Sequence, residues 1–240
     1  MPTTGPKSRA KRPKPTRGDR VNDWARLREE VASAGRRLLA EGLVARTWGN
    51  VSVRAGPEHM LITPTGLAYD SISAADIVPV NLRNCAHMGP LLPSSEGRLH
   101  AEIYRTRRDV NAVIHTYQMN ASTVAAARRE VPPILDDMAQ IIGPSVRVAQ
   151  YAPSSTGRIV RSTVKALRGR MAALMANYGA VCVGRDMEEA FVVCQILEKA
   201  CRAFIEAEFL GGAKSIDRAD ARTMHRYYLQ KYSKLSRRKP

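Results

Sequence analysis

Short apolar segments, bounded by turn residues and flanked by helical patterns, restrict the fold of this 240-residue chain more than any other feature. Two of them, 50–54 (NVSVR) and 59–64 (HMLITP), lie on either side of a Gly-Pro turn. Two more, 172–177 (AALMAN) and 179–184 (GAVCVG), meet around Asn-Tyr-Gly. Apolar runs of this length between turn residues are typical of strands, and the second pair predicts a hairpin.

Helical patterns lie outside these segments. Near the N-terminus, residues 22–23 can cap a helix in which apolar side chains recur from Trp24 to Leu38. Near the other end, Asp186 can cap a second helix, and Glu189 stands at the third position, as in a capping box. Further helices are expected over residues 98–107, 120–128 and 217–231. Short strands between helices predict an α/β domain built in layers.

The net charge of +16 is concentrated at the two ends of the chain. Residues 1–20 carry +6 and residues 231–240 carry +5, which together make 11 of the 16 charges. We expect a disordered basic tail over 1–20, a folded domain over 21–232 and a second basic tail over 233–240. Such tails keep a protein in solution, or contact a polyanion by releasing its counterions.

Other broad classes of protein are disfavoured. No apolar run approaches the length of a membrane span, and the N-terminus lacks the apolar core of a secretory signal. The four cysteines show neither a CxxC motif nor a paired framework, so we expect free thiols in a reducing cytoplasm.

Three turns are rich in small residues of the kind that let backbone N–H groups approach an anion. They contain Gly49-Asn50, Thr65-Gly66 and Ser94-Ser95-Glu96. Each of them alone is weak evidence, because Gly, Ser and Pro cluster in ordinary turns.

The order of these turns is more specific. Together with 109–117 (DVNAVIHTY), 151–153 (YAP) and 177–191 (NYGAVCVGRDMEEAF), it resembles the class II aldolase/adducin family over about residues 22–210. The resemblance implies a single three-layer α/β domain with a central, mostly antiparallel sheet between helices. It also implies a homotetramer, with active sites between subunits, that acts on a small anionic substrate.

In active members of that family a divalent metal, typically zinc, is held by two histidines of an H-x-H motif and a third from N-H-G. The resemblance places Glu96 at the family's acid/base carboxylate and His115 at the first histidine. Tyr117 and Tyr178 stand at the positions of the other two histidines. The residues matching its phosphate-binding turns are Gly49, Asn50, Thr65, Gly66, Ser94 and Ser95.

The two tyrosines predict an altered metal site. A phenol has a pKa of about 10, so it gives up its proton to a metal at greater cost than an imidazole does. Zinc sites normally use three or four protein ligands, whereas Glu96 and His115 supply two. We therefore expect no metal, or a weakly bound divalent ion.

Three alternatives remain open. In the first, which we favour, the protein is a lyase-type enzyme for a small phosphorylated or carboxylated carbonyl compound. Glu96 then moves the proton, and His115, Tyr117 and Tyr178 polarise the substrate oxygen. In the second, the tyrosines help to bind Fe(III). In the third, the protein is a non-catalytic binding or assembly protein like the adducin head domain, since fold does not fix function.

Two further residues are expected to be structural. His100, four positions after Glu96, is interpreted as a core or surface histidine. Tyr151 is interpreted as a buried tyrosine that hydrogen-bonds to the backbone.

Overall fold

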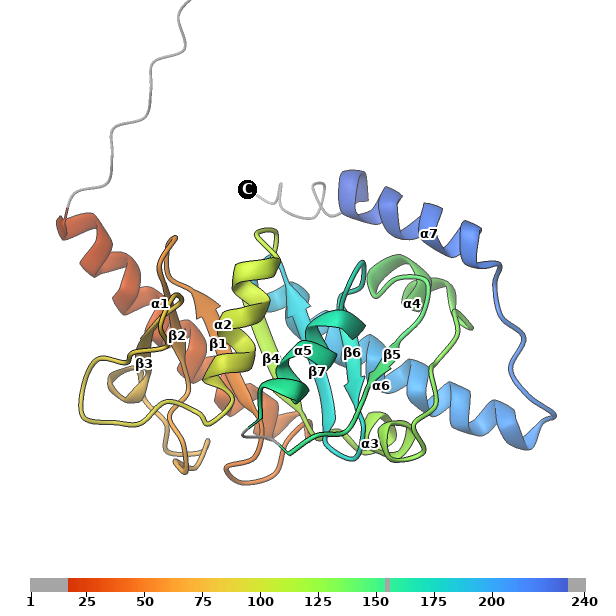
Figure 1. Ribbon diagram of the computed structural model, residues 1–240, viewed down its shortest axis with the longest axis horizontal. Coiled ribbons are helices and arrows are strands. Elements are labelled where there is room, and N and C mark those ends of the chain that lie inside the picture. Colours follow the sequence, from red (N-terminus) through yellow and green to blue (C-terminus); the bar gives the residue numbers. More distant parts are fainter. Residues whose placement is uncertain (1–16, 154–155, 233–240) are drawn as a thin grey trace, which may run out of the picture.

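The computed structural model describes residues 17–153 and 156–232, which form one seven-stranded sheet with helices on both faces (Figure 1). The strands are β1 Asn50–Arg54, β2 His59–Ile62, β3 Val78–Asn81, β4 Ala112–Thr116, β5 Arg147–Ala149, β6 Ala172–Met175 and β7 Gly179–Gly184. The α-helices are α1 Arg17–Ala40, α2 Gly97–Thr106, α3 Met119–Ala126, α4 Asp136–Ile141, α5 Gly157–Ala166, α6 Met187–Phe209 and α7 Arg218–Tyr227.

The sheet confirms the expected mostly antiparallel arrangement. Its strand order is β3-β2-β1-β4-β7-β6-β5, and β5 with β6 is the parallel pair. The predicted hairpin is β6–β7. Strand β4 is central, with Asn50 of β1 opposite His115 on one side and Ala180 of β7 opposite Thr116 on the other. All five residues of β4 are buried, which is expected of a strand covered on both faces.

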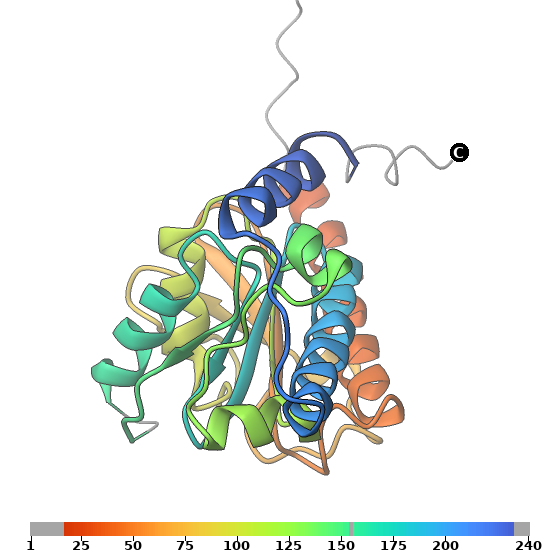
Figure 2. The ribbon, with the colours of Figure 1, turned by 90° about the vertical axis from the view of Figure 1, so that its right-hand side faces the viewer.

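Helices cover the sheet in two outer layers, as the three-layer prediction requires. Figure 2 shows α2 and α5 on one face and α1 and α6 on the other. The buried face of α6 carries the apolar residues that its helical spacing predicted, including Ala190, Cys194 and Leu197. No helix in the described ranges is both long and apolar enough to cross a membrane.

Two boundaries differ from the sequence prediction. Helix α1 begins at Arg17, so residues 17–20 belong to the helix and not to the basic tail. Residues 1–16 and 233–240, which make up the rest of the predicted tails, lie outside the described residues. The last helix changes at Tyr228 from α-helix to a π-helical turn that ends at Tyr232.

The start of α6 forms only half of the predicted capping box. The Asp186 side chain accepts a hydrogen bond from the backbone N–H of Glu189 at 2.9 Å, as expected. The carboxylate of Glu189, however, accepts from the backbone N–H of Arg185 at 2.7 Å and pairs with the Arg185 guanidinium. This nearby cation holds the carboxylate more strongly than a neutral N–H would.

Candidate active site

The four predicted catalytic residues lie together near the end of β4. This end of the strand is at the lower edge of the sheet in Figure 1. The ring centroid of His115 is 4.8 Å from that of Tyr117 and 5.3 Å from that of Tyr178. The two tyrosine rings are 5.8 Å apart and meet edge to face. Glu96 reaches the same point from the turn before α2, where it is bonded to His115. Three segments far apart in the sequence therefore meet at one cluster.

The β6–β7 turn places Tyr178 in this cluster. Asn177 and Gly179 both have positive φ, of 58° and 95°, so the hairpin reverses over very few residues. A Cβ atom added at Gly179 would lie 2.3 Å from the carbonyl oxygen of Thr116. The turn can therefore close onto β4 because residue 179 has no side chain.

Substituting Gly179 by alanine should destabilise the protein by about 3 kcal/mol, from the strain of positive φ together with the steric overlap. Gly56 is a matched control, because it has φ of 85° but nothing within 4 Å of its added Cβ. Gly56→Ala should cost only about 1 kcal/mol. Urea denaturation of both variants measures the difference, and equal losses would contradict the role given to Thr116.

A hydrogen-bonded ion pair forms the centre of the cluster. Oε2 of Glu96 bonds to Nδ1 of His115 and also accepts from the side-chain amide of Asn50 at 2.6 Å. The other ring nitrogen of His115, Nε2, lies 3.1 Å from the carbonyl oxygen of Tyr178. Both neighbours are acceptors, so both ring nitrogens carry hydrogen and His115 is an imidazolium. Glu96 and His115 are both buried.

The pKa values fit this assignment. Burial on its own raises the pKa of the Glu96 carboxyl, but the charge of His115 and the hydrogen bonds from His115 and Asn50 lower it to about 2. Burial alone would lower the pKa of His115, yet the adjoining carboxylate raises that pKa above its ordinary value. Burial, with Tyr178 and Glu96 nearby, raises the pKa of the Tyr117 phenol well above its ordinary value. Near pH 7 the cluster holds a carboxylate, an imidazolium and a neutral phenol.

These donors do not fit the zinc ion that the resemblance implies. Both nitrogens of His115 are already hydrogen-bonded, and the Tyr117 phenol holds its proton. Among the described residues, no group of three or more His, Cys, Asp or Glu side chains is arranged to hold a metal. The expected loss of tight zinc binding rests on this donor chemistry and stays a prediction for metal analysis, as does the Fe(III) alternative.

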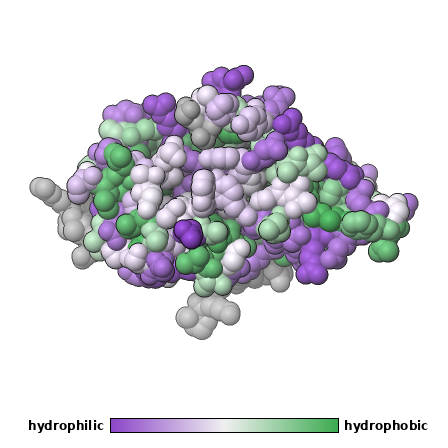
Figure 3. All heavy atoms as spheres, turned by 90° about the horizontal axis from the view of Figure 1, so that it is seen from below, coloured by the Kyte–Doolittle hydropathy of each residue, from purple (hydrophilic) through white to green (hydrophobic). Residues whose placement is uncertain are grey.

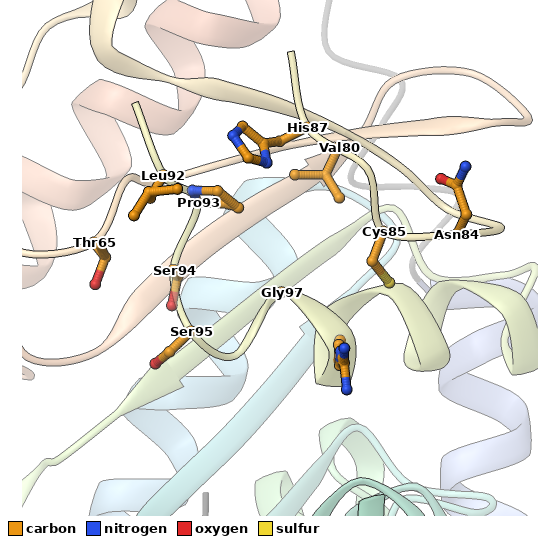
Figure 4. Close-up of a pocket in the computed structure, with 11 residues that line it drawn as sticks. Thr65, Val80, Asn84, Cys85, His87, Leu92, Pro93, Ser94, Ser95 and Gly97 are labelled. Carbon is orange, nitrogen blue, oxygen red and sulfur yellow. The ribbon is translucent and has the colours of Figure 1, made fainter. Parts of the chain in front are cut away.

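The predicted phosphate-binding turns pack against one another beside this cluster. The backbone N–H of Thr65 donates to Leu92 at 3.0 Å, and that of Ser94 donates to Thr63 at 3.0 Å. Thr65, Ser94 and Ser95 then line a cavity of about 410 Å³ (Figure 4). In that view their hydroxyls lie to one side, while Cys85 lies on the other.

The remaining predicted turn has a structural role that its sequence did not reveal. Gly49 has φ of 81°, and an added Cβ would lie 2.7 Å from the carbonyl oxygen of His115. Asn50 is buried and donates to Glu96, so it positions the carboxylate. Gly66 also has positive φ, 74°, but its added Cβ would meet open space.

A second cavity, of about 310 Å³, connects the serine turn to the carboxylate. Ser95 and Glu96 line it from one side, and Thr156 and Gly157 at the start of α5 line it from the other. Ser95 and Arg98 border both cavities, so the two cavities adjoin at the start of α2.

A buried network behind the cluster was not predicted. Oγ of Ser52 lies 2.7 Å from Nδ1 of His100 and 2.9 Å from the hydroxyl of Tyr104. His100 is fully buried, and burial lowers its pKa to about 3, so it is neutral. Of the core and surface roles expected for His100, the structure shows the core role, whereas Tyr151 is 56% exposed and the expectation that it is buried was wrong.

The rim of the cluster carries exposed apolar side chains. Trp48 is 61% exposed, and its ring meets that of Tyr117 edge to face at 5.8 Å. Leu92 and Met119 are 61% and 75% exposed. Figure 3 views the molecule from this end and shows separate apolar patches among polar ones. The aromatic Trp48 is a candidate site residue that sequence reasoning missed, although it directly precedes Gly49.

Known proteins resemble this chain in sequence and in structure. The family model described as Class II Aldolase and Adducin N-terminal domain matches residues 29–205. A 5-methylthioribulose-1-phosphate/5-deoxyribulose-1-phosphate aldolase of Rhodospirillum rubrum is 34% identical over 178 residues, which cover 74% of this chain and 80% of that protein. A 5-deoxy-D-ribulose 1-phosphate aldolase of Bacillus thuringiensis is 30% identical over 188 residues, covering 78% and 88%.

A solved structure of an L-fuculose 1-phosphate aldolase superimposes with a TM-score of 0.81 at 30% identity, covering 85% of this chain and 96% of the other. The family model thus matches the chain from within α1 to within α6. The chain belongs to the class II aldolase/adducin family.

Proposed function

We propose that the protein is a lyase-type enzyme that binds a small phosphorylated or carboxylated carbonyl compound and moves a proton on it without zinc. The observation that carries this proposal is the buried cluster of Glu96, His115 and Asn50, which adjoins two phenol rings and in which Glu96 lines a cavity. As in many family members, we expect the active protein to be a homotetramer.

A phosphate group is the anion that the site suits best. Hydroxyls of Thr65, Ser94 and Ser95 line the larger cavity, and hydroxyl and backbone N–H donors are common phosphate ligands. The relatives named above are aldolases of ribulose and fuculose phosphates. We assign the phosphate to these turns, with the carbonyl end of the substrate placed toward Glu96.

Proton transfer then depends on separating the ion pair. While Glu96 is paired with His115 its low pKa makes it a weak base. If a substrate oxygen takes over the hydrogen bond from His115, burial remains while that bond no longer lowers the pKa of Glu96, so this pKa rises. Glu96 can then accept a proton, while His115 and the neutral Tyr117 phenol donate hydrogen bonds to the substrate oxygen on which negative charge develops.

Hydrogen exchange in a metal-chelating buffer tests this proposal. We expect the full chain to exchange a carbon-bound hydrogen of dihydroxyacetone phosphate with deuterated solvent, and to cleave L-fuculose 1-phosphate or 5-deoxyribulose 1-phosphate, with the chelator present. Activity that appears only after zinc is added would contradict the zinc-free mechanism.

Tyr117→Phe should slow the exchange by about 10² because it removes a single hydrogen-bond donor from the developing charge. The ring stays in place, so the packing against His115 and Trp48 is kept. Tyr227→Phe is the matched control, because Tyr227 is 56% exposed on α7 and should leave the rate unchanged. Equal rates for the two variants would remove Tyr117 from the mechanism.

One observation favours the adducin-like binding protein instead. The hydrogen bonds of His115 are already satisfied within the protein, so the cluster is stable without a substrate. A protein of that class should show a rise in melting temperature with sugar phosphates but no exchange and no cleavage.

A further inference from the structure

One long stretch of the chain contains no acidic residue. From 138 to 185 there is neither Asp nor Glu, whereas seven basic residues occur there: Arg147, Arg158, Arg161, Lys165, Arg168, Arg170 and Arg185. Two of the seven are used internally, because Arg170 donates to Ser145 and Arg185 pairs with Glu189. The other five leave this part of the folded domain strongly positive.

Four of these five line one groove of about 610 Å³ between β5 and α5. Arg158, Arg161 and Lys165 lie on the outer side of α5, whose inner side buries Ile159 and Ala166. Arg147 joins them from β5. No acidic side chain lines the groove, and within 17–153 and 156–232 none of the four cations forms an ion pair.

The rim of this groove has a defined shape and an exposed aromatic ring. The backbone N–H of Gln150 donates to the hydroxyl of Ser162 at 2.6 Å, which ties the segment after β5 to α5. Tyr151 follows and is 56% exposed beside the cations. A positive groove with an exposed aromatic ring is the arrangement that single-stranded nucleic acids bind, with phosphates on the cations and a base on the ring.

The length of the positive row argues for a chain of phosphates over a single one. Arg158 and Lys165 are seven residues apart on a helix, which corresponds to about 10 Å along its axis. A chain of phosphates can contact the whole row at once, whereas a lone phosphate would have to draw these side chains together against their mutual repulsion. Mutual repulsion of the four cations disfavours the empty groove, and a polyanion that spans it relieves that repulsion.

We propose that the β5–α5 groove binds single-stranded nucleic acid, with Arg147, Arg158, Arg161 and Lys165 on successive phosphates and Tyr151 against a base. This site uses no residue of the Glu96–His115 cluster, so its test is independent of the test of the proposed enzyme activity. It differs from the polyanion contact predicted for the tails, because it lies within the folded domain.

The test is a titration of the full chain with a fluorescent oligothymidylate of about 20 nucleotides at several salt concentrations. Changing all four groove cations to alanine should weaken binding about tenfold or more, and should make the salt slope shallower by about 3, at about 0.7 for each charge on a single strand. The matched control removes the same charge from exposed positions outside the groove, in Arg108→Ala, Lys214→Ala, Arg222→Ala and Arg226→Ala combined. This control variant should change neither the binding affinity nor the salt slope much.

Tyr151 separates nucleic acid from other phosphate chains. Tyr151→Ala should weaken oligothymidylate binding by about fivefold or more, whereas Tyr151→Phe should keep it and neither should alter binding of inorganic polyphosphate. Equal losses of oligothymidylate affinity in the groove and control variants would overturn the proposal, because the binding would then depend on the overall charge of the protein and not on the groove. A groove variant that binds normally but changes its mass in light scattering would also overturn it, and would identify an interface between copies of the chain.

Discussion

Changing Tyr117 and Tyr178 together to histidine should give a protein that retains about one zinc ion per chain through dialysis, whereas the unmodified protein retains little. The expected gain is large because the rings of residues 117 and 178 already lie 4.8 and 5.3 Å from the His115 ring. The double variant would therefore supply three imidazoles and the Glu96 carboxylate at one point, a donor set that suits tetrahedral zinc.

The metal has to displace protons in order to bind there. His115 carries hydrogen on both nitrogens, so one must leave before zinc can take its place. Binding should therefore weaken as the pH falls, and calorimetry in buffers of different ionisation enthalpy should show proton release.

Elemental analysis after dialysis measures the ion directly. The matched control carries two new histidines at exposed positions, in Tyr151→His with Tyr227→His, and should stay low in zinc. The single variants Tyr117→His and Tyr178→His should retain an amount of zinc between those of the unmodified protein and the double variant. Stoichiometric zinc in the unmodified protein would show that the phenols had not degraded the site.

Much of the fold follows from local sequence signals. The β6–β7 hairpin is predicted by Asn-Tyr-Gly between two apolar runs, because positive φ at Asn177 and Gly179 is what a tight hairpin needs. The start of α6 follows from Asp186, whose side chain caps it as expected. The start of α1 was missed because residues 17–20 are polar and charged, so they lack an apolar pattern.

The site is less accessible to sequence reasoning, because its contacts depend on strand register. Glu96 and His115 could be grouped only through the family resemblance, since nothing local connects a turn before α2 with the end of β4. Asn50 bonds to Glu96 because β1 pairs with β4 and sets Asn50 opposite His115. The contact between Ser52 and His100 can likewise be predicted only when it is known which helix covers β1. Such pairings are fixed by the packing of the whole domain.

The second large effect is on stability. Glu96→Gln should lower the free energy of unfolding by about 3–5 kcal/mol, because it leaves the buried His115 cation without its partner. Glu102→Gln, on the helix that follows Glu96, is the matched control, since Glu102 pairs with Arg105 near the surface and such pairs contribute little. Urea denaturation at pH 7 compares the two variants.

The pH dependence of stability identifies the group responsible. The pKa of Glu96 falls from an ordinary value of 4.5 to about 2 on folding, so its contribution is complete above pH 4.5 and is lost as the pH falls toward 2. Glu96→Gln should therefore flatten the acid limb of the stability profile in that interval, while Glu102→Gln should leave the limb unchanged.

A double-mutant cycle measures the interaction energy between Glu96 and His115 separately from the effect of changing each residue alone. Glu96→Gln combined with His115→Gln should cost less than the sum of the single changes, because the second change removes the charge that the first had left unpaired. Additive losses, or an acid limb that keeps its slope in Glu96→Gln, would mean that His115 is neutral in the folded protein. The imidazolium would then be unavailable to polarise a substrate oxygen, and the zinc-free mechanism would lose its electrophile.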